Sequence, residues 1–322
     1  MPRLRFLARR LVFTVVLVAA ASSAAMLLIR LAPGDAATEL VGTGASLSAV
    51  AEERDRLGLS RSTGASFTAW ARRAVRLDFG DSFRYGRPVL PLVAERAANT
   101  AVLGLAALGL ATLVGVPLGI VAARRHWLVS SVVGVLSTVG LSLPPLILSI
   151  LLAWLAARTG WFPVGGMTGA AAAGADVAPR AWDLARHLVV PALSLAVPVG
   201  AMLERLQARA LASALDEPWV DAARARGIPS GRIRWLHAAR VAATPVAAVY
   251  GLIVGALLSG SFSVEIVTAW PGLGRLTYEA LLSRDVNLVA GCAAASALFV
   301  ALGVLLSDLA LAWLDPRVTE EA

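Results

Sequence analysis

Long uncharged hydrophobic runs, separated by shorter polar segments, dominate this chain of 322 residues. A run of about 20 apolar residues can cross a bilayer as a helix. Six runs approach or exceed that length: Leu11–Ile29, Ala97–Ala123, Trp127–Ala157, Leu188–Leu203, Val241–Val264 and Val286–Ser307. Because lipid accepts only helices and closed barrels, and the runs lack the alternation of barrel strands, the pattern predicts an all-α polytopic membrane protein with six transmembrane helices.

Proline and glycine positions add detail to these helices. Pro144-Pro145 lies inside the third run and must kink it or break its hydrogen-bond ladder. The fourth run is short and contains Pro191 and Pro198, so its limits are the least defined. Small residues four apart, in Gly115-Val-Pro-Leu-Gly119 and Gly251-Leu-Ile-Val-Gly255, predict close approach of neighbouring helices.

The composition agrees with a membrane protein and excludes one function. The chain is 58% hydrophobic and 16% charged, whereas soluble domains have about 45–50% apolar and about 25% charged residues. All 29 basic residues are arginine, so the chain has no lysine for a Walker A loop. If transport is driven by ATP, another chain must hydrolyse it. The absence of G-x-S-x-G and H-E-x-x-H motifs also argues against a membrane hydrolase.

The net charge of +8 is distributed as in membrane topology rather than as in a nucleic-acid-binding surface. Arginines without acids mark the first ten residues and the turn at 124–126, and the loop 206–240 holds six arginines against three acids. Pro33–Glu95 instead balances eight arginines against eight acids. The positive-inside rule therefore predicts a cytoplasmic N-terminus and a cytoplasmic 206–240 loop, and six spans would place the C-terminus there too.

These features divide the chain into consecutive parts. We expect an N-terminal tail and first span at 1–32, an extracytoplasmic segment at 33–94, a core of five helices at 95–313 and a tail at 314–322. The cytoplasmic loop 206–240 lies inside the core. Within the extracytoplasmic segment, Ala49–Leu57 and Phe67–Leu77 have the periodicity of short surface helices.

A polar island at Glu217–Gly227 interrupts the membrane pattern. We predict that Asp216 caps a helix there, because acids in the first turn and arginines in the last turn complement the helix dipole. The residues in those turns are Glu217, Asp221, Arg224 and Arg226. Gly227 is predicted to end the helix in the left-handed conformation. Ser230 is predicted to cap a second helix, which runs through Arg232 and Arg240 into the fifth span.

One face of the first island helix suggests docking. Trp219, Ala222, Ala223 and Arg226 are three or four residues apart and are predicted to share a face. A large aromatic beside small alanines fits a groove, and arginines can pair with acids at its rim. The alternative is an ordinary cytoplasmic loop whose arginines only fix the topology.

Two acids lie at span ends and are candidates for the transport pathway or its gate. Ionisable residues at these depths are functional hypotheses by default, which applies to Glu204 and Glu265. The alternatives are that the two acids snorkel to the interface or pair with Arg205 and Arg275. The three histidines are scattered, so we expect no metal site and no cofactor.

The island also carries a family resemblance. Asp221-Ala-Ala-Arg-Ala-Arg-Gly227, followed by His237, Arg240 and Pro245, resembles the cytoplasmic "EAA" loop of the dipeptide/oligopeptide permease B-type family of ABC importers. Asp221 stands where the family has glutamate, and Thr244 where it has a hydrophobic residue. Further similar segments follow in order along the chain: Leu31-Ala-Pro-Gly-Asp35, Phe79-Gly-Asp-Ser82, Gly160-Trp-Phe-Pro163, Pro271-Gly-Leu-Gly274 and Leu314-Asp-Pro-Arg317.

The resemblance implies a type I ABC importer permease fold in the inner membrane of a bacterium, with the core at 95–313. It implies a second related permease, two ATP-binding subunits and an extracytoplasmic solute-binding protein as partners, and no nucleic acid. The loop would couple ATPase motion to alternating access through Glu217, Trp219, Asp221, Ala222, Ala223, Arg224, Arg226, Gly227, Arg232, Arg240 and Pro245. Di- or oligopeptides are the expected substrates; nickel complexes, oligosaccharides or a self-sufficient secondary transporter are the alternatives.

Overall fold

The computed structural model describes residues 2–32, 34, 36–42, 46–57, 63–123, 127–169, 174 and 176–314. The predicted turn at Arg124 and Arg125, the proline and aspartate of the segment Leu31–Asp35, and the tail after Leu314 lie outside these ranges. The described chain is helical apart from loops and one antiparallel bridge between Asp81 and Pro88.

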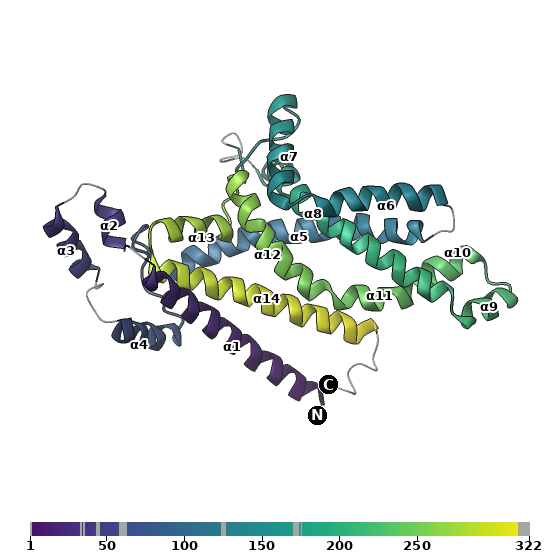
Figure 1. The fold of residues 1–322 in the computed structure, drawn as a ribbon, viewed down its shortest axis with the longest axis horizontal. Coiled ribbons are helices and arrows are strands. Elements are labelled where there is room, and N and C mark those ends of the chain that lie inside the picture. Colours follow the sequence, from purple (N-terminus) through teal and green to yellow (C-terminus); the bar gives the residue numbers. More distant parts are fainter. Residues whose placement is uncertain are drawn as a thin grey trace. The chain divides into compact units, whose positions relative to one another are not determined.

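The helices follow one another along the chain in this order (Figure 1). They are α1 Pro2–Leu31, α2 Ala36–Val41, α3 Leu47–Arg56, α4 Thr63–Ala74, α5 Val89–Ala122, α6 Trp127–Ser142, α7 Pro145–Thr159, α8 Val177–Leu215, α9 Pro218–Ala225, α10 Ser230–Arg232, a π-helix Ile233–Ala238, α11 Ala239–Ala248, α12 Tyr250–Val267, α13 Leu273–Leu282 and α14 Val286–Leu314.

Five of the described helices are long and apolar enough to cross a membrane, and a bent pair brings the number to six if it counts as one span. The five segments are Ala8–Leu31, Val89–Ala122, Val177–Leu215, Tyr250–Val267 and Val286–Ala312. The all-α prediction is confirmed. The limits of the fourth run were too narrow, since α8 continues for 39 residues through Pro191 and Pro198.

The third predicted run, Trp127–Ala157, is interrupted at Pro144-Pro145, as predicted. It is divided into α6 and α7, which are bent by 100°. Pro144 has an extended backbone, with φ −60° and ψ 143°, and Pro145 is the first residue of α7. The break follows because a proline disfavours helical backbone at the residue before it and lacks the N–H that would continue the ladder.

The fifth run is likewise not one uniform helix. The predicted Val241–Val264 begins inside α11, and α12 follows after a single turn residue, Val249. Pro245 lies inside α11 and removes one backbone donor shortly before this turn.

The chain forms two compact units. One comprises Met1–Phe6, Val102–Trp270 and Leu302–Ala322, and α8 contacts α6, α7, α11 and α12 within it. Its largest core includes Leu103, Leu195, Leu203, Ile253 and Trp270.

Glycines set the closest helix approaches in this unit. A Cβ added at Gly115 would overlap the carbonyl oxygen of Gly200, and one at Gly119 would lie 2.6 Å from the carbonyl oxygen of Glu204. A Cβ at Gly251 would lie 3.1 Å from the Cα of Val304, whereas Gly255 has open space. The predicted close packing is therefore confirmed at the first motif and at one end of the second.

The other unit comprises Leu7–Ala101 and Pro271–Ala301. Its core joins α1, α4, α5, α13 and α14 through residues such as Met26, Trp70, Leu92, Leu276 and Leu288. The predicted helices of its polar segment are confirmed as α3 and α4, whose ends lie one to four residues before the predicted ones.

Candidate functional site

The polar island forms α9, and the start of this helix differs from the prediction. Glu217 is the N-cap residue, with φ −74° and ψ 147°, and Pro218 occupies the first helical position. The prediction that Asp216 caps α9 is wrong, because α8 extends to Leu215 and Asp216 is its C-cap residue. The Glu217 carboxylate instead accepts a hydrogen bond of 2.8 Å from Trp219 Nε1.

The end of α9 is a Schellman motif. Gly227 has φ +76° and donates its N–H to the Arg224 carbonyl at 2.9 Å, while Ile228 donates to the Ala223 carbonyl at 3.2 Å. A Cβ at Gly227 would meet no atom within 4 Å, so the backbone conformation alone favours glycine there. The predicted left-handed stop is confirmed.

The inner face of α9 is narrow and apolar. Val220 is fully buried and Ala223 is 9% exposed, and both belong to one small core with Ile233. Leu215, Trp219 and Ile228 are partly buried against this core. The Val220–Ala223 pair was missed by the sequence reasoning, although its three-residue spacing is the usual signal of a buried helix face.

The outer face of α9 carries charged side chains and one small side chain. Asp221, Ala222, Arg224 and Arg226 are exposed, and Arg224 pairs with Asp221 at 3.0 Å. The predicted face of Trp219, Ala222, Ala223 and Arg226 is therefore not uniformly exposed. Ala223 faces the core, Trp219 is half-buried, and only Ala222 and Arg226 of that set lie on the outer surface.

The second half of the island leads directly into the membrane helices. The prediction that Ser230 caps a helix is wrong, since Ser230 is the first helical residue after Pro229. The helix then passes through a π-helical stretch, Ile233–Ala238, into α11. Such stretches are frequent at functional sites. Arg232 and Arg240 are both exposed.

A cavity of about 650 Å³ lies between α9 and the π-helix. Glu217 and Trp219 line it on the α9 side, and Leu236, His237, Arg240 and Val241 line it on the other. The space between the start of α9 and the start of α11 is therefore partly open rather than filled by side chains throughout.

The two candidate membrane acids are both buried. Glu204 is 3% exposed and accepts a hydrogen bond from Ser137 on α6, while Arg205 donates to Thr138 on the same helix. The alternative of a Glu204–Arg205 ion pair is therefore wrong: in the described part of the chain, each of the two side chains bonds to a hydroxyl of α6 instead. Glu265 on α12 is fully buried.

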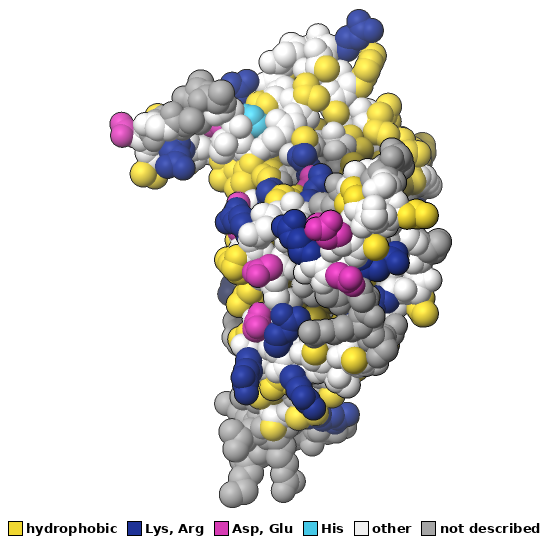
Figure 2. All heavy atoms as spheres, turned by 90° about the vertical axis from the view of Figure 1, so that its left-hand side faces the viewer, with side chains coloured by type: hydrophobic (Ala, Val, Ile, Leu, Met, Phe, Trp, Pro, Cys, Tyr) yellow, Lys and Arg dark blue, Asp and Glu magenta, His cyan; other side chains and the backbone are white. Residues whose placement is uncertain are grey.

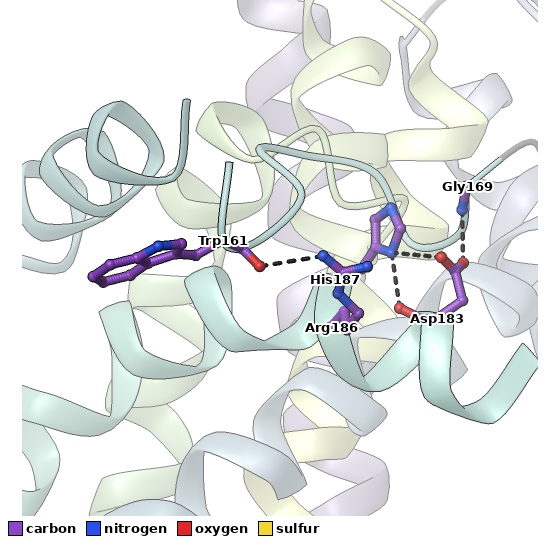
Figure 3. Close-up of polar contacts among 5 residues, drawn as sticks. All are labelled: Trp161, Gly169, Asp183, Arg186 and His187. Carbon is purple, nitrogen blue, oxygen red and sulfur yellow. Dashed lines mark hydrogen bonds and ion pairs between the residues drawn. The ribbon is translucent and has the colours of Figure 1, made fainter. Parts of the chain in front are cut away.

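At the other end of α8 a polar cluster holds a loop (Figure 3). Asp183 Oδ2 accepts the backbone N–H of Gly169 at 2.7 Å, and His187 Nδ1 lies 2.8 Å from the Asp183 carbonyl and 3.5 Å from its carboxylate. Arg186 donates to the Trp161 carbonyl at 3.2 Å. These hydrogen bonds fix loop 160–169 to α8. The described residues contain no group of three or more side chains able to hold a metal ion.

The second unit has its own polar clamps. Asp285 is fully buried and accepts hydrogen bonds from Ser82 Oγ at 2.6 Å, Arg84 N at 3.2 Å and Leu288 N at 3.1 Å. Tyr85 donates its hydroxyl to Glu279. Burial is the larger cause and this hydrogen bond the smaller cause of a raised pKa of the Tyr85 phenol.

Comparison with known proteins identifies the family. Residues 115–320 match the family described as binding-protein-dependent transport system inner membrane component. A probable peptide ABC transporter permease protein of Sinorhizobium fredii, y4tP, is 33% identical over 97% of this chain and 98% of its own length. The oligopeptide transport system permease protein AppB of Bacillus subtilis is 28% identical over the same shares, and a putative peptide transport system permease protein of Brucella abortus is 35% identical over 91% of each chain.

The match spans more than half of the chain and includes α6 to α14, and hence the polar island and both buried acids. The resemblance drawn from the sequence is confirmed, as is the prediction of a multi-pass membrane protein. The chain belongs to the binding-protein-dependent transport system inner membrane component family.

Proposed function

We propose that this chain is the permease subunit of a peptide importer driven by a separate ATPase, and that α9 is its coupling helix. The observation that carries the coupling assignment is the sidedness of α9. A short helix, ended by a glycine stop, buries Val220 and Ala223 and presents Asp221, Ala222, Arg224 and Arg226 outward. The peptide substrate is supported by the printed names of relatives that cover nearly the whole chain.

The connections of α9 support transmission of motion. Only Asp216 and Glu217 separate α8 from α9. Leu215 and Trp219 pack against a core that includes Leu211 of α8 and Ala242 of α11. A displacement of α9 would therefore act on both helices, because close-packed elements move together rather than deform.

The outer face of α9 supports a protein partner rather than a lipid one. Its arginines can pair with acids at the rim of a groove, and Ala222 leaves room for close approach. Arg232 and Arg240 extend this basic surface toward α11, and Pro245 is proposed as the end of the coupling segment. Because the chain lacks lysine, the ATP-binding subunits are separate proteins.

The proposed assembly contains a second related permease, two ATP-binding subunits and an extracytoplasmic solute-binding protein. In the proposed topology, α6 and α7 count as one span, which gives six, and both termini and the 206–240 loop are cytoplasmic. The proposed parts are the first span at 1–32, the extracytoplasmic segment at 33–94, the core at 95–313 and the tail at 314–322.

Glu204 and Glu265 are proposed to line or gate the transport pathway, since buried acids in membrane segments are costly without a role.

Cysteine labelling tests both the topology and the coupling role. Cys292 is fully buried and is the only native cysteine, so introduced thiols can be read alone. Ala222→Cys and Thr68→Cys are both at exposed positions. A membrane-impermeant thiol reagent should label Thr68→Cys in intact cells and Ala222→Cys only after permeabilisation. A bifunctional cross-linker should join Ala222→Cys, but not Thr68→Cys, to a Walker A ATPase; the reverse pattern contradicts the assignment.

Uptake by a strain lacking the gene tests the substrate. We expect loss of labelled di- or oligopeptide uptake, restored by the intact gene, with nickel uptake unchanged. Loss of nickel uptake alone would keep the coupling mechanism and reject the peptide substrate. Restored uptake without any co-purifying ATPase would instead favour a self-sufficient transporter.

A further inference from the structure

A polar pocket of about 320 Å³ lies in the second unit, and its lining includes no residue of α9 and neither candidate acid. Arg30 at the end of α1, Ser66, Trp70 and Arg73 on α4, and Asn287 at the start of α14 line it. Figure 2, which faces the side carrying α2, α3 and α4, shows arginine and acidic side chains interspersed on this surface.

Three buried polar atoms in this lining have no hydrogen-bond partner within the described part of the chain: Arg30 Nε, Ser66 Oγ and Trp70 Nε1. The Trp70 side chain packs between Phe67 and Phe79, and the residue is only 3% exposed. An unsatisfied buried polar group costs about 1–3 kcal/mol. All three atoms belong to residues that line one cavity, so we treat them as donors for a ligand bound there.

The chemistry of these atoms defines the ligand. Arginine Nε and indole Nε1 can only donate, and a serine hydroxyl can donate as well. The ligand must accordingly be an acceptor. The pocket also contains Arg73 and Arg56 and a single acid, Asp81, while Arg56 is already paired with Glu53 at 3.2 Å. The remaining positive charge favours an oxyanion, because guanidinium groups match phosphate oxygens in charge and geometry.

The position of the pocket along the membrane helices identifies the source of that oxyanion. One candidate span ends at Leu31, next to Arg30, and another begins at Val286. Both Arg30 and Val286 line the pocket, so the pocket lies at the depth where a bilayer carries its phosphate headgroups. Met26 and Phe83 add apolar walls that suit the glycerol and first acyl carbons. We propose that this pocket binds the phosphate group of a phospholipid.

The test measures lipid retention by the full-length protein. The protein is purified in mild detergent, delipidated and titrated with phosphatidylglycerol, and bound lipids are counted by native mass spectrometry. We expect one phosphatidylglycerol to bind more tightly than the rest. Arg73→Gln should weaken this binding roughly tenfold, as expected for the loss of one charge-assisted hydrogen bond. Arg72→Gln, an exposed neighbour on the same helix outside the pocket, should leave binding unchanged.

A second variant keeps the test independent of folding defects. Trp70→Phe removes one donor but retains an aromatic ring in the core. The quantity compared is the rise in thermal unfolding temperature on adding lipid, because the smaller ring also leaves space in the core and changes the lipid-free unfolding temperature of the variant. Added phosphatidylglycerol should then stabilise the wild type more than the variant.

Two ligand controls separate the sources of the anion. Diacylglycerol with the same acyl chains lacks the phosphate, and inorganic phosphate lacks the lipid. Equal retention of diacylglycerol, or unchanged retention in both Arg73→Gln and Trp70→Phe, would overturn the proposal. Stabilisation by inorganic phosphate without phosphatidylglycerol binding would overturn the lipid source and identify a soluble anion instead.

Discussion

Substitution of Gly227 by valine isolates the C-terminal stop of α9. The residue has φ +76°, where a side chain with a Cβ costs about 1–2 kcal/mol and a β-branched one is a genuine outlier. Since a Cβ at this position meets no atom within 4 Å, no steric clash with a neighbour adds to this backbone penalty. The expected effect is thus confined to the Schellman motif, where Gly227 and Ile228 donate to the last carbonyls of α9.

A penalty of about 1–2 kcal/mol changes the equilibrium between closed and open helix end by roughly 5- to 30-fold. Hydrogen exchange of the amides at positions 227 and 228 measures that equilibrium directly, because local opening limits exchange there. We expect protection to fall by this factor in Gly227→Val. Gly231→Val is the matched control, since Gly231 has ordinary backbone angles and equally open space around its Cβ position.

The same pair of variants links the stop to transport. With membrane insertion unchanged, Gly227→Val should reduce uptake and ATPase association, whereas Gly231→Val should leave both near the wild-type level. Equal amide protection in the two variants would refute the strain argument. Reduced protection with normal uptake would refute the coupling role of α9 while leaving its local structure as described.

Three further predictions concern stability. Gly115→Ala should destabilise the protein by about 1–3 kcal/mol, because the added Cβ overlaps a backbone oxygen on α8, whereas Gly109→Ala has open space; equal unfolding temperatures would contradict this. Asp285→Asn should cost about 1–3 kcal/mol by weakening the bonds at the start of α14, read from chemical unfolding. The raised pKa of Tyr85 stabilises the folded state below the unfolded pKa of about 10, and this stability is lost as pH rises through the folded value. Tyr85→Phe should thus flatten the alkaline stability profile, and an unchanged profile would exclude this cause.

Features that depend on a short stretch of chain, such as helix positions and helix ends, were predicted from the sequence. The apolar runs located every long helix, and Gly227 marks the end of α9 as predicted. The doubled proline predicted an interruption after α6. The angle of 100° between α6 and α7 depends on contacts with other helices, because both helices contact α8 and α7 also contacts α12. Such packing has no signature in a single stretch of sequence.

The wrong cap at Asp216 has a simple physical cause. The apolar run of α8 ends near Leu203, yet the helix continues for twelve residues through a polar stretch whose inner face still packs, with Leu211 and Ala214 buried. Hydrophobicity averaged along the chain cannot detect a narrow buried stripe of this kind. Once α8 reaches Leu215, Asp216 must close that helix, and the N-cap position passes to Glu217.

Partners distant in sequence explain the remaining differences. Glu204 is bound by Ser137, 67 residues earlier, and not by the neighbouring Arg205. The faces of α9 were likewise assigned by spacing alone, which identifies residues that share a side but not the side that is buried. Ile233 makes that choice by packing on Val220 and Ala223 in one small core. The arginines of the island are therefore directed outward by an apolar contact from the following helix, so a change at Val220 should disturb the proposed coupling surface as surely as a change at Arg226.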